Sequence, residues 1–504
     1  MKKLLLYSTL YTLFSVVLAC QRTASVPASY AEATDSLAIW PDYTDVTLPP
    51  NIAPCNFRVV DDVADEFVAT LGDMVVAATD DGVVQWDSVA WRQTLAANRG
   101  KSLAMHIFSH RPTGWVRHET TITVADEDID RYLSYRLIEP GYELYRQLGL
   151  YQRDLTNFDE EPIVENNREF EGEHNHCLNC HNYQSYDTRR FLFHIRGMHG
   201  GTMIVRDGVP TKVAIKHDSI LGTGVYPTWH PTEDLIVFST NQTGQTFHQY
   251  HRERIEVLDK KSDLLFYDIE RNEVKHILRT DSALETFPCW TPKGDRLFYC
   301  EAKMPPMPAE MPDSMLTPWM VAHWDSLLYD VKSLAFDLRT RSFGAPRTEV
   351  SLAKDGFSAS VPRVSPDGRY VLFTRGRYGQ FHIWHLDADL WVKDLQTDSC
   401  YALTATNSPD ADSYHTWSSN SRWIVLASRR DDGNYSRAFI AYFDKNGVGH
   451  KAFLLPQQHP DHNLYRLRSY NVPELTRTKV PTTHTQLQQA IYKQEATKAT
   501  YKEK

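Results

Sequence analysis

The residues with the most specific chemistry lie in one short run, HCLNCH at positions 176–181. Two cysteines separated by two residues and followed at once by a histidine form the attachment pattern of a c-type haem. In that pattern the thiols bond to the two vinyl groups and the imidazole binds iron. The chain holds 7 cysteines and 21 histidines in 504 residues, so chance rarely produces this pattern. The spacing predicts one covalent haem on Cys177, Cys180 and His181.

Candidates for the sixth iron ligand follow the motif in the run FLFHIRGMHGGT at positions 191–202. His194 and Met198 have the two side-chain types that usually fill this position, and His199 lies beside them. The alternatives are that His194 is a core histidine, that Met198 only packs, or that the iron is five-coordinate. Arg196 is predicted to pair with a haem carboxylate, because a guanidinium binds carboxylates in a bidentate manner.

Two other kinds of site also use a Cys-x-x-Cys pair. A thioredoxin-like redox pair needs a βαβ context and a helix N-terminus, which the residues before Cys177 do not offer. A structural zinc site needs two further ligands. The chain has no second Cys-x-x-Cys to supply them, so the local candidates are His174 and His176. We assign no chemical role to the remaining cysteines. The sequence is compatible both with buried free thiols and with one disulfide among Cys55, Cys289, Cys300 and Cys400.

No set of nucleophile, base and orienting group is evident elsewhere in the chain. The acidic residues are scattered through loops and are typical of solvated charge rather than of a catalytic carboxylate pair. We therefore assign no catalytic residue, and the sequence favours an electron-transfer or binding protein over an enzyme.

The N-terminus has the features of a secretory signal: Lys2 and Lys3, then an apolar stretch ending in VLAC at positions 17–20. The stretch is too short to span a bilayer. VLAC resembles the bacterial lipoprotein signal, which implies cleavage after residue 19, lipidation of Cys20 and a membrane anchor facing the periplasm. The absence of Asp after the cysteine implies the outer membrane. Residues 20–39 are predicted to be a flexible tether.

The overall composition excludes some classes of protein. The 54 Lys and Arg residues are outnumbered by 64 Asp and Glu residues, which gives a formal net charge of −10. Such a chain has no basic field for nucleic acid. With 23% charged residues and no long apolar run beyond the N-terminus, a polytopic membrane protein is also excluded.

Turn signals and apolar stretches divide the mature chain into further segments. Residues 40–128 contain short apolar runs between turns and are predicted to form a β-sandwich. Residues 129–188 are predicted to be an aromatic, partly helical connector that carries the haem motif. Residues 189–472 are predicted to form a β-propeller, and residues 473–504 a polar tail or a marginal helix.

The propeller prediction rests on an internal repeat. Four segments align, each a strand, a turn and a second apolar strand: YPTWHPTEDLIVFS at 226–239, FPCWTPKGDRLFYC at 287–300, VPRVSPDGRYVLFT at 361–374 and YHTWSSNSRWIVLA at 414–427. A second hairpin follows the first three units, so each period supplies a four-stranded blade. The alignment predicts five to seven blades with Trp229, Trp290 and Trp417 at equivalent positions.

These repeats resemble the units of TolB-type propellers through turns such as SPDG at 365–368 and hairpins such as DLQT at 394–397. Residues 40–458 also resemble a group of Bacteroidetes exported proteins described as TolB-like or as cytochrome c biosynthesis proteins. That resemblance is carried by NIAPCNF at 51–57, RLIEPGY at 136–142, CLNCH at 177–181 and FHIRG at 193–197. It implies export, a haem and an all-β chain in which a β-sandwich precedes a TolB-like propeller with a c-type haem segment.

Three functions follow from these expectations. The first is a lipid-anchored, single-haem cytochrome whose propeller face docks a redox or envelope partner. The second is a TolB-like periplasmic binding or scaffold protein with a structural or sensory haem. The third is a haem enzyme such as a peroxidase, which needs an open distal position. The combination of propeller and haem also looks like the plan of the hydrazine synthase alpha subunit, but one haem motif does not carry that activity over.

Overall fold

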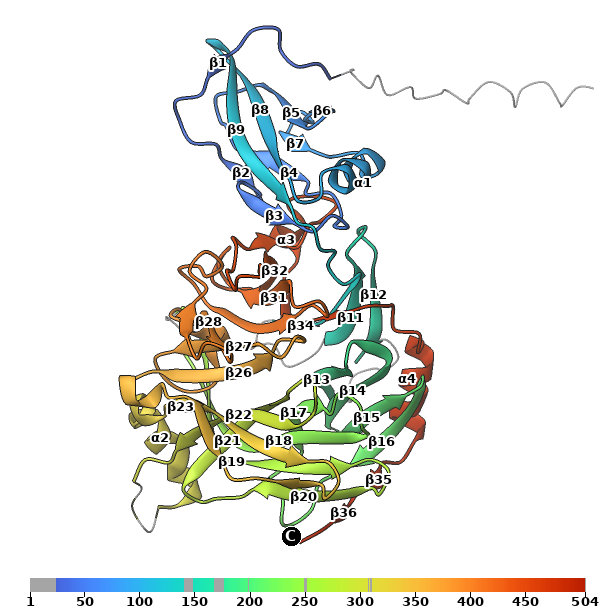
Figure 1. Ribbon diagram of the computed structural model, residues 1–504, viewed down its shortest axis with the longest axis vertical. Helices are drawn as coiled ribbons and strands as arrows, with labels where there is room; N and C mark the ends of the chain where they lie inside the picture. Colours follow the sequence, from blue (N-terminus) through green and yellow to red (C-terminus); the bar gives the residue numbers. More distant parts are fainter. Residues whose placement is uncertain are drawn as a thin grey trace, which may run out of the picture.

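The computed structural model describes residues 24–139, 148–166, 176–197, 199–248, 252–306, 308 and 311–503. Figure 1 shows a smaller N-terminal domain stacked on one edge of a larger ring of sheets. Strands dominate both parts, so the all-β fold expected from the sequence is confirmed.

The N-terminal domain consists of two sheets and one helix. The larger sheet has the strand order β1-β9-β8-β5-β6 with β3 beside β9, and the smaller has the order β2-β4-β7. In the second half of β9 buried and exposed side chains alternate, as expected for a sheet with one face in a core. The strands are β1 Ala31–Glu32, β2 Ile39–Trp40, β3 Val46–Leu48, β4 Phe57–Val59, β5 Glu66–Leu71, β6 Met74–Ala77, β7 Val83–Val84, β8 Ser102–Arg111 and β9 Gly114–Val124.

The helix of this domain, α1 (Ser88–Ala97), was not predicted. Asp87 caps it by accepting hydrogen bonds from the backbone N–H groups of Val89 at 3.0 Å and Ala90 at 2.8 Å. Trp91 and Leu95, one turn apart, are both buried. The cap and this four-residue apolar spacing are the local signals that distinguish the segment from a strand.

The N-terminal domain shares a hydrophobic core with the ring. Tyr43 and Leu48 belong to the same buried cluster as Trp423, Ile440 and Phe453 of the ring. The indole N–H of Trp423 also donates to the carbonyl oxygen of Glu127 at 3.1 Å. Because burial of large apolar side chains stabilises both parts at once, the two domains form one packed unit.

The ring contains six blades, each of which we name after its innermost strand. Each blade is an antiparallel sheet of four successive positions, and the innermost strands of neighbouring blades contact one another around a closed circle. The blade strands are β34 Ser469–Thr476 with β10 Tyr132–Ile138, β11 Leu148–Asp154 and β12 Glu160–Glu165; β13 His176–Gln184, β14 Asp187–Gly197, β15 Gly201–Arg206 and β16 Val209–Ala214; β17 Gly224–Trp229, β18 Leu235–Phe247, β19 Ile255–Asp268 and β20 Glu273–Leu278; β21 Ala283–Trp290, β22 Arg296–Lys303, β23 Tyr329–Asp337, β24 Ser342–Phe343 and β25 Arg347–Val350; β26 Ser358–Val364, β27 Tyr370–Gly376, β28 Asp389–Asp394 and β29 Cys400–Ala402; and β30 Asp412–Trp417, β31 Trp423–Ser428, β32 Arg437–Tyr442 and β33 Phe453–Leu454.

The ring closes by pairing two distant parts of the chain. β10 pairs with β34 in antiparallel register, from Tyr132 opposite Thr476 to Ile138 opposite Ser469. The predicted connector 129–188 is therefore part of the ring, since it supplies three strands of the β34 blade and the strand β13. The predicted propeller start at residue 189 is too late for the same reason. Local sequence carries no signal for a pairing between such distant segments.

Every innermost strand contains the same bulge. In each innermost strand, one non-glycine residue has a positive φ. At that point the ladder register shifts, so two residues of the innermost strand have no paired residue on the next strand. Proline follows in four of the six strands, where its missing N–H costs no ladder hydrogen bond. The six residues are Cys180 (φ 51°), Tyr226 (46°), Phe287 (52°), Val361 (52°), Tyr414 (44°) and Val472 (49°).

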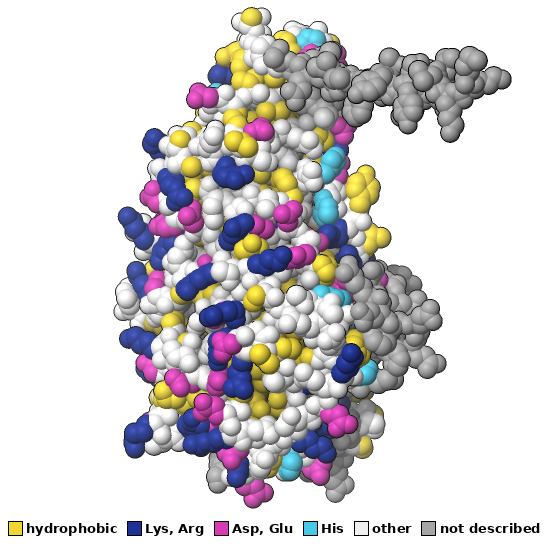
Figure 2. Space-filling view, turned by 90° about the vertical axis from the view of Figure 1, so that its right-hand side faces the viewer, with side chains coloured by type: hydrophobic (Ala, Val, Ile, Leu, Met, Phe, Trp, Pro, Cys, Tyr) yellow, Lys and Arg dark blue, Asp and Glu magenta, His cyan; other side chains and the backbone are white. Residues whose placement is uncertain are grey.

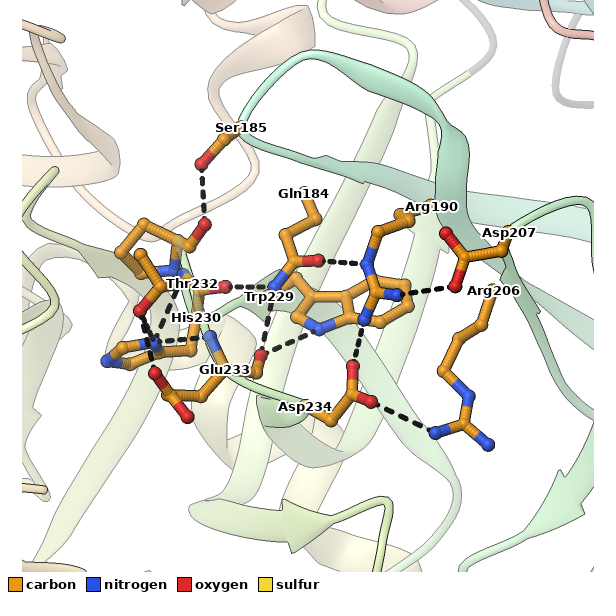
Figure 3. Close-up of polar contacts among 11 residues, drawn as sticks. Gln184, Ser185, Arg190, Arg206, Asp207, Trp229, His230, Thr232, Glu233 and Asp234 are labelled. Atoms are coloured by element: carbon orange, nitrogen blue, oxygen red, sulfur yellow. Dashed lines mark hydrogen bonds and ion pairs between the residues drawn. The ribbon is translucent and has the colours of Figure 1, made fainter. Parts of the chain in front are cut away.

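A polar network joins the β13 blade to the β17 blade at the turn after β17 (Figure 3). His230 closes that turn by accepting the backbone N–H of Glu233 at 3.1 Å through Nδ1. Gln184 at the end of β13 donates to the carbonyl oxygens of His230 at 2.8 Å and Glu233 at 2.9 Å. Arg190 on β14 pairs with Asp234 across the same junction. These contacts fix the end of β13 relative to its neighbour.

Shorter elements decorate the ring. The Pro-rich excursion at 304–317 leads into α2 (Asp313–Ala322), which packs on β19. The segment predicted as a polar tail first completes β34 and then forms α4 (His484–Lys493), which a capping box at Thr483 begins. β35 (Thr497–Lys498) and β36 (Thr500–Tyr501) then add in parallel to β16 and β20. The other helical turns are η1 Trp324–Ser326, η2 Ala353–Asp355, η3 His382–Trp384 and α3 His462–Tyr465.

Truncation tests the role of ring closure. A chain that ends at Arg468 lacks β34, so we expect it to lose the cooperative thermal unfolding transition. A chain that ends at Gln494 lacks only the short, mostly exposed strands β35 and β36 and should keep that transition with a small decrease in Tm. A chain that ends at Thr482 separates the loss of α4 from the loss of β34. Equal melting curves for all three truncations and the full chain would contradict the closure.

Candidate functional site

The predicted haem motif lies on β13, the innermost strand of its blade. Cys180 and His181 are the two bulged residues, so they occupy the position of Tyr226-Pro227, Phe287-Pro288 and the equivalent pairs in the other blades. Residues 180–183 are thus a further copy of the internal repeat. The sequence alignment missed it because Cys-His-Asn-Tyr shares no residue with Tyr-Pro-Thr-Trp at 226–229.

The three motif side chains line one cavity of about 400 Å³ within the ring, which we call the thiol cavity. Cys177, Cys180 and His181 all border it, as does Arg196, so the structure brings together the four residues that the sequence assigned to haem binding. Tyr226 and Tyr414 border it at the level of the bulges. The volume lies within the range of small-molecule and cofactor sites.

A second cavity of about 300 Å³ lies at the end where the innermost strands finish, and we call it the tryptophan cavity. Trp229, Trp290 and Trp417, the last residues of β17, β21 and β30, border it as equivalent blade positions, as the repeat predicts. His181 and Arg363 border both cavities. The bulged residues Pro227 and Val472 also border both cavities, so we call the level of the bulges the waist between the two compartments.

His181 is buried, at 5% exposure, and its Nε2 atom has no hydrogen-bond partner among the described residues. Burial, with a smaller contribution from the positive charge of Arg136, lowers the pKa of His181 to about 3. Glu474 lies 3.7 Å from Nε2, but burial raises the pKa of that carboxyl group to about 8. Both groups are therefore mainly neutral at pH 7, and the contact is not a salt bridge.

His415 provides an internal comparison, because it occupies the same bulge position in β30. Its Nε2 atom lies 3.1 Å from the carbonyl oxygen of Leu372, so the ring is satisfied by the backbone. The Nε2 atom of His181 has no such partner among the described residues, although both histidines are buried and occupy the same position in the repeat. The position alone therefore explains a buried histidine at 181 but not its unpartnered nitrogen.

Positive charge lies next to the two thiols. Arg136 on β10 places Nη1 3.9 Å from the Cys177 sulfur, and Arg196 is opposite Cys177 in the β13–β14 ladder. Burial raises the pKa of the Cys180 thiol, and the nearby charge of Arg196 opposes that rise. The sequence analysis did not assign Arg136 to the site, because its place in the ring depends on the pairing of β10 with β34.

The other predicted site residues stand apart from this group. His194 is buried on β14, with Nδ1 3.3 Å from the Thr202 hydroxyl, and does not border either of the two cavities. Met198 and Cys20 lie outside the described residues. The six described cysteines are all free thiols, so no disulfide joins Cys55, Cys289, Cys300 or Cys400.

The described part of the chain limits the alternatives to a haem. No group of three or more His, Cys, Asp or Glu side chains there is arranged to hold a metal ion. A structural zinc site needs four ligands that converge within about 2.0–2.3 Å of one point, which Cys177, Cys180 and His181 do not provide in this arrangement. No helix in those residues is long and apolar enough to cross a membrane.

No protein family model and no curated protein matches the chain. Among solved structures, it is similar to a putative TolB from Agrobacterium tumefaciens, with 14% identity, 68% of this chain and 98% of that chain covered, and a TM-score of 0.36. It is also similar to TolB from Acinetobacter baumannii, with 10% identity, 77% and 85% covered, and a TM-score of 0.39. At these TM-scores the similarity carries no argument, and the propeller assignment rests on the six sheets.

The buried neutral histidines predict a dependence of stability on acid. Burial lowers the pKa of His415 to about 3, whereas its ordinary value is 6.5. The unfolded chain therefore binds a proton that the folded chain does not, and the free energy of unfolding should fall as the pH falls from about 6.5 toward about 3. His415→Gln should reduce this slope by up to about 1.4 kcal/mol per pH unit, measured by urea unfolding at several pH values. Superimposable slopes for the variant and the wild type would contradict the assignment.

Proposed function

We propose that this chain is an exported, lipid-anchored cytochrome that holds one c-type haem on Cys177 and Cys180, with His181 as an iron ligand, and transfers electrons to a partner docked on the propeller. The observation that supports it is the shared cavity: Cys177, Cys180 and the buried His181, whose Nε2 atom has no hydrogen-bond partner among the described residues, all border one space inside the ring. Each is a group that haem attachment consumes.

The chemistry of the donor set fits a haem better than the alternatives. A ligating imidazole must be neutral at the coordinating nitrogen, and burial keeps His181 in that state at neutral pH. Thiols bond to the edge of the haem ring and not to the metal, so Cys177 and Cys180 need not converge with His181 on one point. A zinc site requires that convergence.

When bound, the haem supplies a single-electron iron couple, whose potential depends on its axial ligands, burial and nearby charge. This chain would anchor the haem macrocycle through Cys177 and Cys180 on β13. It would also contribute the imidazole of His181, which the bulge of β13 holds in place. The blades on either side would exclude water, because the motif side chains are nearly fully buried. Met198, which lies outside the described residues, and His194, which does not border the thiol cavity, remain the two candidates to compare as the sixth ligand. A protein whose iron has an open sixth position would instead suit a peroxidase.

The proposed location follows from the N-terminal signal and Cys20, which would anchor the mature chain at the periplasmic side of the outer membrane. Part of the predicted tether belongs to the N-terminal domain, because β1 (Ala31–Glu32) pairs with β9 there and is not a free linker. Figure 2 shows basic and acidic side chains interspersed over one face of the molecule, without a large field of one sign there. A mixed surface of this kind suits a protein partner better than nucleic acid.

Haem attachment is the first test. The full chain, produced in cells with haem-attachment machinery, should show a Soret band, covalent haem staining and a mass increase of one haem. Replacing both Cys177 and Cys180 by Ala should abolish the covalent stain. His181→Ala should lose the low-spin spectrum or the haem itself, because it removes an axial ligand.

Matched variants separate a haem role from a folding role. Cys289→Ala and Cys300→Ala remove buried thiols from the β21 blade, and His415→Ala removes the histidine at the equivalent bulge of β30. All three should keep the covalent haem. A wild-type protein that folds without any haem would contradict the cytochrome proposal and leave the periplasmic scaffold function in its place. Comparison of His194→Ala with Met198→Ala would identify the sixth ligand, because only its loss gives a high-spin spectrum that responds to cyanide.

Membrane attachment is tested at Cys20. The wild-type chain should sediment with membranes and release with detergent, whereas Cys20→Ala should stall before cleavage or appear in the soluble periplasmic fraction. Both should give the same protease-resistant core, because the lipid does not contribute to the fold. Equal partitioning of the two proteins into the soluble fraction would show that Cys20 carries no anchor.

A further inference from the structure

The thiol cavity is strongly cationic in a chain whose formal net charge is −10. Four arginines border it, whereas Glu139 is the single acidic residue among the described residues that line it. The arginines come from four different blades, so the ring brings together charges that lie far apart in the sequence. They are Arg136 on β10, Arg196 on β14, Arg363 on β26 and Arg429 after β31.

Among the described residues, three of these guanidinium groups form no close ion pair, although the charges of Asp410 and Asp432 act on Arg429 from a greater distance. Within the described part of the chain, Arg136, Arg363 and Arg429 make no ion pair with an Asp or Glu side chain. Arg136 is 9% exposed with its Nε atom unpartnered, and Arg429 is 3% exposed and lies over the ring of Trp384 at 3.2 Å. An excess of positive charge in a largely buried lining is costly, so a cavity lined by four arginines and one Glu among the described residues is suited to an anion that offsets this charge.

The remaining lining combines polar Asn, Gln, Ser and Thr side chains with an apolar part at the level of the bulges. The waist contributes the aromatic rings of Tyr226 and Phe287, which contact each other at 4.4 Å, together with Val361. In a ring of six blades, the β26 blade that carries Arg363 is directly across from the β13 blade that carries the thiols. A ligand that fills the cavity therefore meets thiols on one wall, apolar groups in the middle and a guanidinium on the opposite wall.

We infer that the thiol cavity binds an apolar molecule bearing separated carboxylates, and that Arg363 holds one carboxylate on the wall opposite the thiols. A guanidinium fits a carboxylate in a bidentate manner, which a lysine cannot reproduce. The carboxylates belong either to the proposed haem, whose two acid groups lie on the edge opposite the vinyl groups, or to a free aromatic dicarboxylate. In the first case the inference rests on the proposed function, and Arg363 replaces Arg196 as the carboxylate partner.

Arg363 is the residue to test because it is half-buried and makes no ion pair with a carboxylate among the described residues; its side chain donates to the adjacent Pro362 carbonyl oxygen at 3.0 Å and contacts the Cys289 thiol. Terephthalate is the probe, and 1,4-benzenedimethanol, which has the same ring without charge, is its control. Calorimetric titration of the full chain with both motif cysteines changed to Ala should detect terephthalate and not the diol. Arg363→Gln should weaken binding by about tenfold or more, and Arg363→Lys by less.

Arg339→Gln is the matched control, because that side chain is 85% exposed on the outside of the ring. It should leave terephthalate binding unchanged. Circular dichroism and Tm of each variant exclude unfolding as the cause of any loss.

Haem-loaded wild-type protein distinguishes the two sources. If the haem supplies the carboxylates, loaded protein should not bind terephthalate, and Arg363→Gln should keep its covalent haem but show a lower midpoint potential, because a positive charge near the iron is lost. If loaded protein also binds the probe, the ligand is a free dicarboxylate. Probe binding by a wild-type chain that carries no haem would reject the proposed cytochrome and retain the carboxylate site. Absence of probe binding in every preparation, with no shift of potential in loaded Arg363→Gln, would overturn the inference.

Discussion

The pairing of β10 with β34 is the constraint on which the rest of the structure depends. It joins residues 132–138 to residues 469–476 and so converts a row of sheets into a closed ring. Closure leaves each innermost strand with a neighbour on both sides, and only then does an enclosed interior exist. The thiol cavity needs this closure directly, because Arg136 belongs to β10 while Cys177 belongs to the next blade along the chain.

The repeated bulge decides what projects into that interior. Six residues of positive φ, two of them β-branched valines, hold a conformation that non-glycine residues rarely adopt. Such backbone persists only where the surroundings determine it, and here the same geometry recurs in every blade. The haem motif occupies one of these bulges, so Cys180 and His181 serve a structural repeat and border the ring interior at once. This double role is why the comparison with His415 is informative: the fold needs a bulge at both places, but only His181 leaves a nitrogen without a partner.

Electrostatics gives the interior a character that the outside lacks. One outer face carries charges of both signs, whereas the lining of the thiol cavity is dominated by arginine. Buried guanidinium groups without carboxylate partners are unfavourable in the empty protein, and a bound anion offsets that cost. A cavity with thiols on one wall and an arginine on the opposite wall can therefore orient a ligand as well as bind it. Both proposals use this polarity: haem attachment uses the thiol wall, and the carboxylate site uses the arginine wall.

The sequence by itself determined the features that depend on neighbouring residues. The motif at 176–181, the repeat with its tryptophans at 229, 290 and 417, and the all-β class all follow from spacing within a few residues or from one period to the next. The helix α1 carried a local signal too, in Asp87 and the pair Trp91 and Leu95, although the strand pattern around it obscured that signal. Tertiary structure alone decided the closure of the ring, the number of blades within the predicted five to seven, and the pairing of the last residues as strands, whereas a helix was one of the two predictions for residues 473–504. It also decided that Arg136 and Arg363 meet the thiols in one cavity, because residues from different blades are brought together by packing and by no regularity along the chain.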